Sequence, residues 1–180
     1  QAGYEHTGEG PAEFVLDGDP DTLWHTNWQG TSRANHWIQF ELSEDYVVDG
    51  LRYLPRSGSN NGVITKYDIQ ISNDGVTFES IKTGSWANNK SWKAAEFEGV
   101  QAKYVRLVSL ESVSDNSYVF ASAAEIRLTG YKPGEEPVEN PFTDVNEVDY
   151  AEFYDAILWA VEEGITNGTG DGTTFDPNGK

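Results

Sequence analysis

Short runs of β-branched and aromatic residues alternate with clusters of Gly, Asn, Asp and Ser from about residue 12 to Tyr131. This alternation is typical of short strands joined by turns. Within residues 36–42, apolar side chains recur at every second position, as in a strand with one buried face. Several such strands imply two packed sheets, because an open sheet would expose its apolar face. The sequence therefore predicts an all-β sandwich, whose clearest strands are residues 36–42, 47–54, 67–71, 77–81, 104–110 and 125–128.

The composition changes after Tyr131. Residues 132–140 are rich in proline and glutamate and nearly free of apolar residues, so we expect an extended linker there. Beyond the linker, apolar residues recur with the spacing of a helix, and Gly164 stands where a C-cap belongs. We therefore divide the chain into a β-domain at 1–131, a linker at 132–140 and a small, partly helical segment at 141–180. The helical positions are Tyr150, Phe153, Tyr154, Ile157, Leu158 and Val161.

Charge and residue usage exclude several classes of function. The formal charge of −18 at pH 7 disfavours nucleic acids and anionic membrane surfaces as partners. The sequence contains no apolar run of about 18 residues, so it gives no signal for a membrane-spanning helix. The absence of Cys excludes disulfides and thiolate chemistry, and in a surface protein it favours a bacterial source. Signals for catalysis are weak, because no two histidines have a metal-ligand spacing and no nucleophile or phosphate-binding motif is present.

An acidic loop at residues 17–22 places three carboxylates within five positions, with Gly18 available for a tight turn. Such a loop concentrates the hard oxygen ligands that calcium prefers. Its spacing differs from that of a helix–loop–helix calcium site. An ordinary acidic turn before a strand would have the same composition, so these residues alone leave both interpretations open.

Three polar loops contain residue types that bind sugars. Residues 23–28 place two Trp beside a His and an Asn, and an aromatic ring can cover the apolar face of a sugar while polar groups bind its hydroxyls. Residues 56–62 supply an Arg and two amides, and residues 115–120 end in aromatic residues. Each loop could equally be structural, with its aromatic side chains in the core. For Trp24 we favour the core.

Six segments of the β-domain carry a further signal: LDGDPDTLWHTNW at 16–28, HWI at 36–38, VDGLRYLPR at 48–56, SNDGV at 72–76, AKYVRL at 102–107 and SAAEI at 122–126. Together and in this order, they make residues 3–131 resemble the family 32 carbohydrate-binding modules of the discoidin, or coagulation factor V/VIII C-type, superfamily. This resemblance implies a β-sandwich jelly roll of about eight strands. It also implies a structural calcium ion that ties the start of the domain to its end, away from the sugar. The implied ligands are the side chains of Asp17 and Glu125, both oxygens of Thr22, and the carbonyls of Phe14, Asp19 and Ala124.

The same resemblance implies a site for galactose-configured sugars, including N-acetylgalactosamine, on loops at one end of the sandwich. His25 and Arg56 match the family's hydrogen-bonding residues directly, and Trp28 aligns with an aromatic neighbour of the His. We expect Trp28→Ala or Phe120→Ala to abolish glycan binding with little change in the melting temperature. The remaining matches are Asn61 or Asn60 for the amide and Phe120, or Tyr118 in its place, for a second ring.

Residues 141–180 resemble a bacterial S-layer homology motif, through FTDV at 142–145, YDAI at 154–157, WAVEEGITNG at 159–168 and TFDP at 174–177. Such motifs usually occur three in a row and together bind cell-wall polysaccharide. Here the chain ends before the Thr-Arg that normally follows, so we expect one incomplete copy, from a longer surface protein, that does not anchor to the wall alone.

We therefore predict a non-catalytic carbohydrate-binding module from a secreted or surface-displayed bacterial protein. It would recognise terminal galactose or N-acetylgalactosamine on host glycans, with structural calcium as cofactor. Its other partners would be the catalytic domain of a glycan-degrading parent enzyme and, through complete S-layer homology repeats, cell-wall polysaccharide. The alternatives are a discoidin-type adhesion or protein-interaction domain that uses the same loops, and a small glycosidase.

Overall fold

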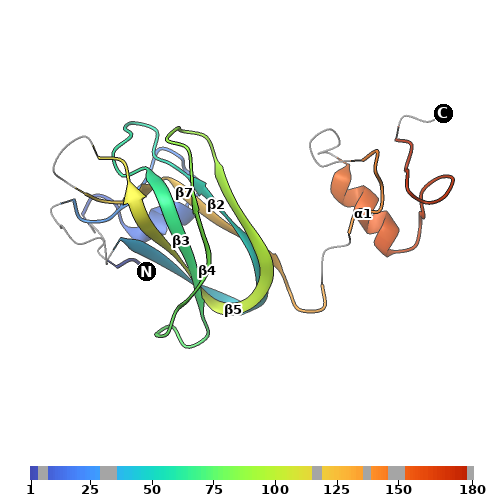
Figure 1. Cartoon of the computed structure of the whole chain (residues 1–180), viewed down its shortest axis with the longest axis horizontal. Helices are drawn as coiled ribbons and strands as arrows, with labels where there is room; N and C mark the ends of the chain where they lie inside the picture. The colour runs from blue at the N-terminus through green and yellow to red at the C-terminus, as the bar shows by residue number, and fades with distance from the viewer. Residues whose placement is uncertain (4–7, 29–35, 115–118, 136–138, 146–152, 178–180) are drawn as a thin grey trace. The chain divides into compact units, whose positions relative to one another are not determined.

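The computed structural model describes residues 1–3, 8–28, 36–114, 119–135, 139–145 and 153–177. It divides into two compact units, Gln1–Gly134 and Glu135–Lys180, so the division falls inside the expected linker. Within these described ranges, the first unit contains a 3₁₀ helix, η1 (Ala12–Leu16), and seven strands, and the second contains one short helix. Figure 1 shows the strands of the first unit and the helix of the second. The strands are β1 (Trp24–His25), β2 (Trp37–Leu54), β3 (Ile64–Ser72), β4 (Glu79–Ser85), β5 (Lys93–Ser112), β6 (Ser122–Ala123) and β7 (Glu125–Tyr131).

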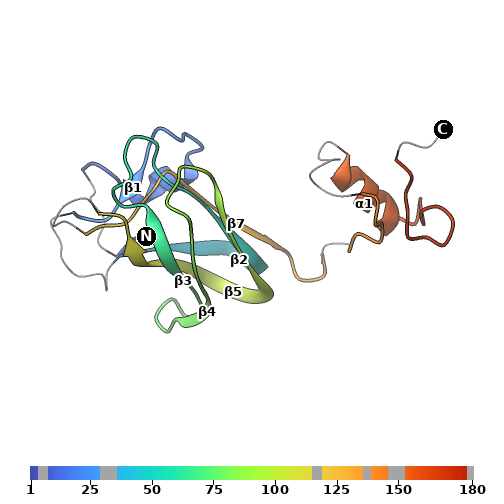
Figure 2. The same ribbon diagram turned by 45° about the horizontal axis from the view of Figure 1, so that its top comes forward.

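Two antiparallel sheets form the first unit. Five strands follow the order β4-β3-β5-β2-β7, and β1 pairs with β6 in a separate two-stranded sheet. The long strands β2 and β5 curve strongly along their length (Figure 2). Their register shifts between Glu41 and Tyr46 and again between Val48 and Gly50, as in β-bulges, which increase bending and twist. Residues 37–42 and 47–54, which the sequence assigned to two strands, thus lie in one continuous strand that bends at these bulges. The two sheets confirm the predicted all-β architecture of this unit.

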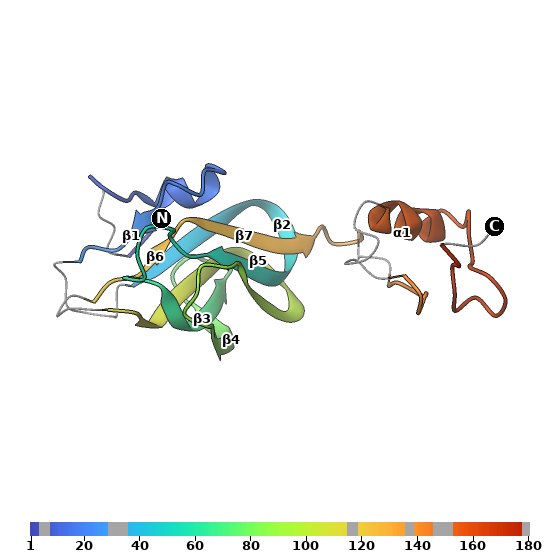
Figure 3. The same ribbon diagram turned by 90° about the horizontal axis from the view of Figure 1, so that it is seen from above.

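The core lies between the sheets and beneath η1, and it includes the fully buried Trp24. Burial of Trp24 confirms its expected place in the core. Tyr53, Trp86 and Tyr67 form an aromatic stack, with ring centroids 5.1 Å apart for the first pair and 3.9 Å for the second. Seen from above, β1 and β6 lie side by side near the N-terminus of the chain (Figure 3). The stack and the small sheet together support the end of the domain that carries the loops.

The turn between β3 and β4 contains Asn73-Asp74-Gly75, residue types that favour tight hairpin turns, and it joins two antiparallel strands. Gly75 has a φ of +72°, and a Cβ there would lie 3.1 Å from the Tyr104 ring. The Asp74 carboxylate accepts hydrogen bonds from the backbone N–H groups of Val76 (2.8 Å) and Thr77 (2.7 Å). The sequence signal is therefore explained by a left-handed glycine beside a carboxylate that caps the turn.

The second unit holds α1 (Tyr154–Glu162), and the predicted helix position Tyr150 lies outside the described residues. Its small core consists of Phe142, Val145 and Ile157, with Tyr154, Val161 and Phe175 packed against it. Gly164 follows the helix with a φ of +65°, as expected of a C-cap. At nine residues, this described helix is too short to cross a bilayer.

Candidate functional site

A pocket of about 300 Å³ opens at the loop end of the β-domain. His25 comes from β1, Trp28 and Leu23 from the segments flanking β1, Arg56 from the loop after β2, and Phe120 from the segment before β6. The structure thus brings together four residues that the sequence singled out, from three separate stretches of the chain. Its lining residues are Glu9, Leu23, His25, Trp28, Arg56 and Phe120.

His25 is held in one orientation by its neighbours. Its Nδ1 lies 2.9 Å from the carbonyl oxygen of Thr26, and because a carbonyl can only accept, Nδ1 carries the proton. The other ring nitrogen, Nε2, lies 3.8 Å from Glu9 Oε2. Gly10 makes this packing possible, since a Cβ at that position would lie 2.5 Å from the imidazole Cδ2. The ring therefore presents Nε2 beside a carboxylate on the pocket wall.

Thr26 couples the His25 segment to the Phe120 segment. The Thr26 N–H donates to the Ala121 carbonyl (2.9 Å), and the Ala121 N–H donates to Thr26 Oγ1 (3.0 Å). Both residues are fully buried, so these bonds form out of contact with water. The paired segments continue into the two-stranded sheet, where His25 is in register with Ser122. This arrangement fixes the separation of two pocket walls.

Arg56 contributes a hydrogen-bond donor. Its Nε is buried, and no described residue accepts a hydrogen bond from it. A buried donor without a partner is costly, so a ligand or water that accepts from it would be favoured. The guanidinium is planar and its donors are fixed in direction, which suits recognition of hydroxyl oxygens on a rigid ring.

Phe120 is more buried than its expected role as an exposed platform requires. Its side chain is 8% exposed, and its ring meets that of His25 edge-on, with centroids 5.9 Å apart and planes at 64°. A Cβ at Gly62, whose φ is +81°, would lie 2.6 Å from this ring. The expectation that Phe120→Ala leaves stability unchanged is therefore corrected, since its ring packs the base of the pocket.

Two further residues that the sequence predicted as ligand-binding, Asn60 and Asn61, do not line this pocket. Asn60 is exposed and Asn61 half-buried, and both lie in the loop after Arg56. Tyr118 falls outside the described residues. Conversely, Glu9 and Leu23 line the pocket and were not predicted. Glu9 stands between two glycines in a segment without periodicity, so no sequence signal identified it.

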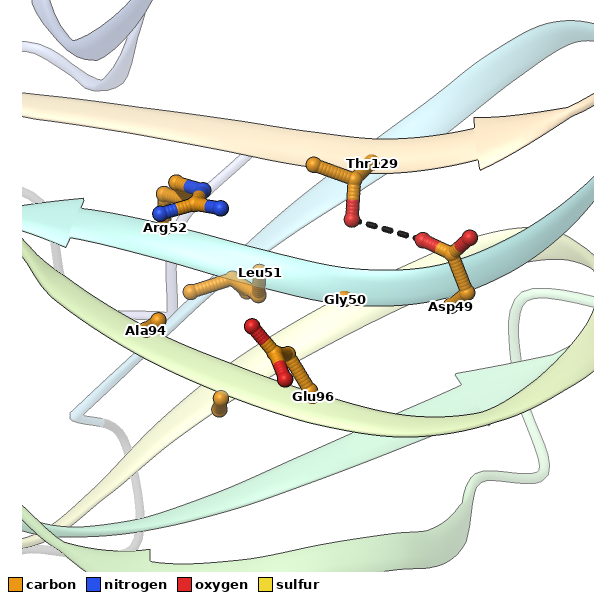
Figure 4. A pocket seen from close by; sticks show the side chains of 8 residues that line it. Asp49, Gly50, Leu51, Arg52, Ala94, Glu96 and Thr129 are labelled. Atoms are coloured by element: carbon orange, nitrogen blue, oxygen red, sulfur yellow. Dashed lines mark hydrogen bonds between the residues drawn. The ribbon is translucent and has the colours of Figure 1, made fainter. Parts of the chain in front are cut away.

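A larger hollow, of about 360 Å³, lies on the five-stranded sheet (Figure 4). Asp49, Arg52 and Glu96 surround it, and Thr129 Oγ1 donates to Asp49 Oδ1 (2.6 Å). None of its lining residues is aromatic, so it offers no ring on which a sugar could stack. Chemistry rather than size therefore favours the loop-end pocket as the candidate site.

The acidic loop forms a compact turn around Asp17. Its carboxylate accepts from the Asp19 N–H (2.8 Å) and from the Thr22 hydroxyl (2.8 Å). The same hydroxyl lies 3.0 Å from the Asp19 carbonyl oxygen, and Gly18 has a φ of +77°. The oxygen atoms of these three residues, which the family resemblance assigned to calcium, thus face one another.

Glu125, at the start of β7, faces this loop. It is 4% exposed, and its Oε1 has no hydrogen-bond partner among the described residues. Burial and the nearby Asp17 carboxylate raise the pKa of Glu125, while Arg127 opposes the shift. An orphaned carboxylate oxygen beside a second carboxylate is the environment that a divalent cation relieves.

Calcium fits this arrangement through a mixed set of oxygens. No group of three or more His, Cys, Asp or Glu side chains in the described ranges is arranged to hold a metal. Two carboxylates would therefore act with a hydroxyl and backbone carbonyls, which calcium accepts readily. Phe14 lies in η1 and Ala124 directly precedes β7, so their carbonyls come from the two segments that the ion would join.

Comparison with known families agrees with the division of the chain. The sequence profile of the F5/8 type C domain matches residues 1–126. That of the S-layer homology domain matches residues 141–180. Both matches lie within the units observed in the structure.

Several characterised proteins share the β-domain. A sialidase of Micromonospora viridifaciens is 32% identical over 130 residues, which are 69% of this chain and 19% of the sialidase. An A type blood N-acetyl-alpha-D-galactosamine deacetylase of Flavonifractor plautii is 32% identical over 143 residues, which are 78% of this chain and 18% of the deacetylase. The chain thus spans less than a fifth of the length of these two relatives.

Solved structures show the same fold. CpGH89CBM32-5 of Clostridium perfringens, in complex with GalNAc-beta-1,3-galactose, is 39% identical with a TM-score of 0.63, and the match covers 71% of this chain and 91% of that one. The family 32 CBM of C. perfringens NanJ, in complex with galactose, is 31% identical with a TM-score of 0.63, covering 71% and 90% respectively. Both are carbohydrate-binding modules of nearly the size of the first unit.

Proposed function

Because this chain belongs to the F5/8 type C domain family and has the fold of its family 32 carbohydrate-binding modules, we propose that it binds terminal galactose or N-acetylgalactosamine in the loop-end pocket. The observation that carries this proposal is the convergence of His25, Trp28, Arg56 and Phe120 around one pocket. Two modules of similar sequence were solved with galactose or a disaccharide containing N-acetylgalactosamine, which supports the same ligand class here.

The pocket combines donors, acceptors and rings in the way a galactose-configured sugar requires. Such a sugar has polar hydroxyls, one of them axial, and an apolar patch of C–H groups. Arg56 would donate to ring hydroxyls, while His25 Nε2 and the Glu9 carboxylate would accept from them. Trp28, which is half-buried, would cover the apolar patch. The Glu9 carboxylate favours neutral sugars over acidic ones.

Binding of one sugar would be weak and would serve to localise a larger protein. A monosaccharide of roughly a dozen heavy atoms, at about −0.3 to −0.4 kcal/mol per atom, gives a Kd near millimolar. Weak binding still raises the effective concentration of an attached domain at a glycan surface. The two relatives are much longer proteins named as enzymes. We infer that this non-catalytic module delivers a glycan-degrading catalytic domain to host glycans.

Calcium would act in this module as a structural ion. It would be held by Asp17, Thr22 and Glu125 with backbone carbonyls, and it would neutralise the buried Glu125 carboxylate. Asp17 and Glu125 are far apart in sequence, so the ion would hold together the ends of a long loop. Its binding would offset the entropy lost when these ends come together on folding. Neither residue lines the sugar pocket.

The match of residues 141–180 to the S-layer homology domain supports a bacterial cell-surface location for the protein. Complete sets of such repeats would give it cell-wall polysaccharide as a further partner. The sugar-binding module would then be displayed outward from the wall, in contact with the glycans of a host.

Retention on immobilised galactose tests the function. We expect the protein to bind galactose resin, to elute with free galactose, and to lose retention with Trp28→Ala. Trp159→Ala is the matched control, because Trp159 is 54% exposed and belongs to the second unit. Lack of retention of the unaltered protein on galactose and N-acetylgalactosamine resins would refute the proposal. Capture by a protein that free galactose does not displace would favour an adhesion domain, and turnover of an aryl galactoside would favour a glycosidase.

A further inference from the structure

Two loops meet beside the candidate sugar pocket. Residues 55–63 join β2 to β3 and carry Arg56, and residues 86–92 join β4 to β5. Both loops lie at one end of the sheet, because Tyr53 near the end of β2 is in register with Lys93 at the start of β5. Figures 1 and 2 show the two loops on that side of the domain. Only the first contributes a side chain to the pocket.

Lys90 connects the two loops. Its ammonium donates to the carbonyl oxygen of Arg56 (2.9 Å) and also to the carbonyl oxygen of Ser59. The two carbonyls lie on either side of the turn that follows Arg56. One cation therefore fixes the backbone of the Arg56 loop at two points, with the stronger bonds that a charged donor makes.

The turn that carries Lys90 is itself held firmly. Lys93, which is 7% exposed, donates to the carbonyl oxygens of Asn89 (3.2 Å) and Ser91 (2.6 Å) and to the side chain of Asn89. The base of the loop is fixed by buried Trp86, whose Nε1–H donates to the Ala94 carbonyl oxygen (2.9 Å). Lys90 thus reaches across from a braced segment, which allows it to constrain the neighbouring loop.

The charge of Lys90 acts on Arg56 as well. In the described part of the chain, no carboxylate forms an ion pair with Lys90, although the sequence holds 30 acidic residues. Partial burial first, and the nearby Arg56 guanidinium second, lower the pKa of the Lys90 ammonium. Like charges repel, so the Lys90 ammonium disfavours rotamers that fold the guanidinium back over its own loop. The hydrogen bonds from Lys90 to the two carbonyls fix the backbone of the loop, and the repulsion between Lys90 and Arg56 restricts the guanidinium. Both effects therefore limit the positions that the Arg56 side chain can take.

We propose that Lys90 is a positioning residue of the sugar pocket, which binds the Arg56 loop through two carbonyls and keeps the guanidinium directed at the ligand. The inference rests on the proposed galactose-binding function and adds a residue outside the pocket lining. Lys90 is exposed, so its replacement removes little core packing. The expected effect is on ligand affinity rather than on folding.

Galactose titration of the isotope-labelled full chain by NMR, with melting temperatures measured in parallel, tests this role. We expect Lys90→Met to raise the galactose Kd about three- to tenfold, as loss of one or two net hydrogen bonds from the bound geometry would. Lys90→Arg keeps the charge and the donors and should restore most of the affinity. Lys66→Met is the matched control. Lys66 pairs with Glu111 on the surface (2.8 Å), so this substitution also removes one cation, but at a different place.

The outcomes separate the two proposals. The positioning role is supported if Lys90→Met binds galactose more weakly than the unaltered protein while Lys90→Arg and Lys66→Met bind it with nearly the same Kd. All three variants should then have melting temperatures similar to that of the unaltered protein. Equal affinity of Lys90→Met and Lys66→Met overturns it while galactose binding stands. A drop in melting temperature that Lys90→Arg does not recover also overturns it, in favour of a folding role. Absence of galactose binding by the unaltered protein refutes the proposed function itself.

Discussion

Removal of the Tyr53 hydroxyl should destabilise the β-domain without touching the ligand. This hydroxyl donates to the Ser122 carbonyl oxygen (2.9 Å) and accepts from the Ile64 N–H (3.1 Å). All three residues are fully buried. The single oxygen therefore joins β2 to the starts of β3 and β6, behind the pocket. Tyr53→Phe would keep the aromatic stack with Trp86 and delete only these two bonds.

The magnitude follows from the two groups left without partners. Each orphaned buried donor or acceptor costs about 1–3 kcal/mol. Burial of the hydroxyl itself costs free energy on folding. Tyr53→Phe removes this cost of about 1–2 kcal/mol, which partly offsets the loss of stability. The free energy of unfolding should therefore fall by about 1–4 kcal/mol. With a urea dependence of about 2 kcal/mol per M, typical of a domain of this size, the unfolding midpoint should move down by about 0.5–2 M.

Urea unfolding followed by tryptophan fluorescence measures this change, because five of the six tryptophans lie in the first unit. Tyr104→Phe is the matched control. Its hydroxyl donates to Glu41 Oε1 at 3.3 Å on the surface, and its loss should cost no more than about 0.5 kcal/mol. Equal midpoints for Tyr53→Phe and Tyr104→Phe would refute the reasoning, since the buried bonds would then contribute nothing beyond exposed ones.

Three further changes probe the ion, the pocket and the hairpin. Asp17→Ala should abolish the rise in melting temperature on adding calcium and leave the galactose Kd unchanged in titrations; loss of sugar affinity first would contradict the separation of the two sites. Phe120→Ala should weaken galactose binding and also lower the melting temperature, whereas Trp28→Ala should mainly weaken binding; equal melting temperatures for both would show that Phe120 packs nothing. Hydrogen bonds from Thr77, Val76 and Ser72 lower the pKa of Asp74 below its ordinary 3.8, so its stabilisation is complete above that pH and is lost as the pH falls through the lowered value. Urea unfolding should therefore show a gap between the unaltered protein and Asp74→Ala that closes in acid, and a gap that is constant with pH would exclude the charged cap.

The fold was predictable because strand periodicity and turn residues are local signals. The Asn-Asp-Gly turn and the strand at residues 36–42 each depend on a few neighbours, and the structure has the turn between β3 and β4 and the strand at the start of β2. The predicted alternation of burial is incomplete, because Gln39 is buried beside Ile38. The continuity of β2 was not predictable, because bulges near Tyr46 and Gly50 arise from pairing with β5, which is distant in sequence. Likewise, β1 and β6 are too short to give a pattern and exist only as each other's partners.

The site was predictable only as far as residue type and family resemblance reach. His25 and Arg56 carry chemistry that is recognisable in a sequence, and the structure places both at one pocket. The burial of Phe120 depends on the close approach of Gly62, and the presence of Glu9 depends on the packing of Gly10 against His25. Such contacts between distant segments leave no periodicity, so sequence reasoning could name the aromatic residue but not its second role in packing.

The way in which the loops are fixed follows from the charge of the chain. With 12 cationic and 30 acidic residues, most carboxylates cannot find a cationic partner, and surface ion pairs are worth little in any case. Lys90, Lys93 and Lys103 instead donate to backbone carbonyls, each holding a segment that is distant in sequence or tightly turned. A carbonyl cannot be protonated at any physiological pH, and its position is set by the backbone. These three lysines therefore act as fixed braces between segments of a domain that has no cysteine and hence no disulfide.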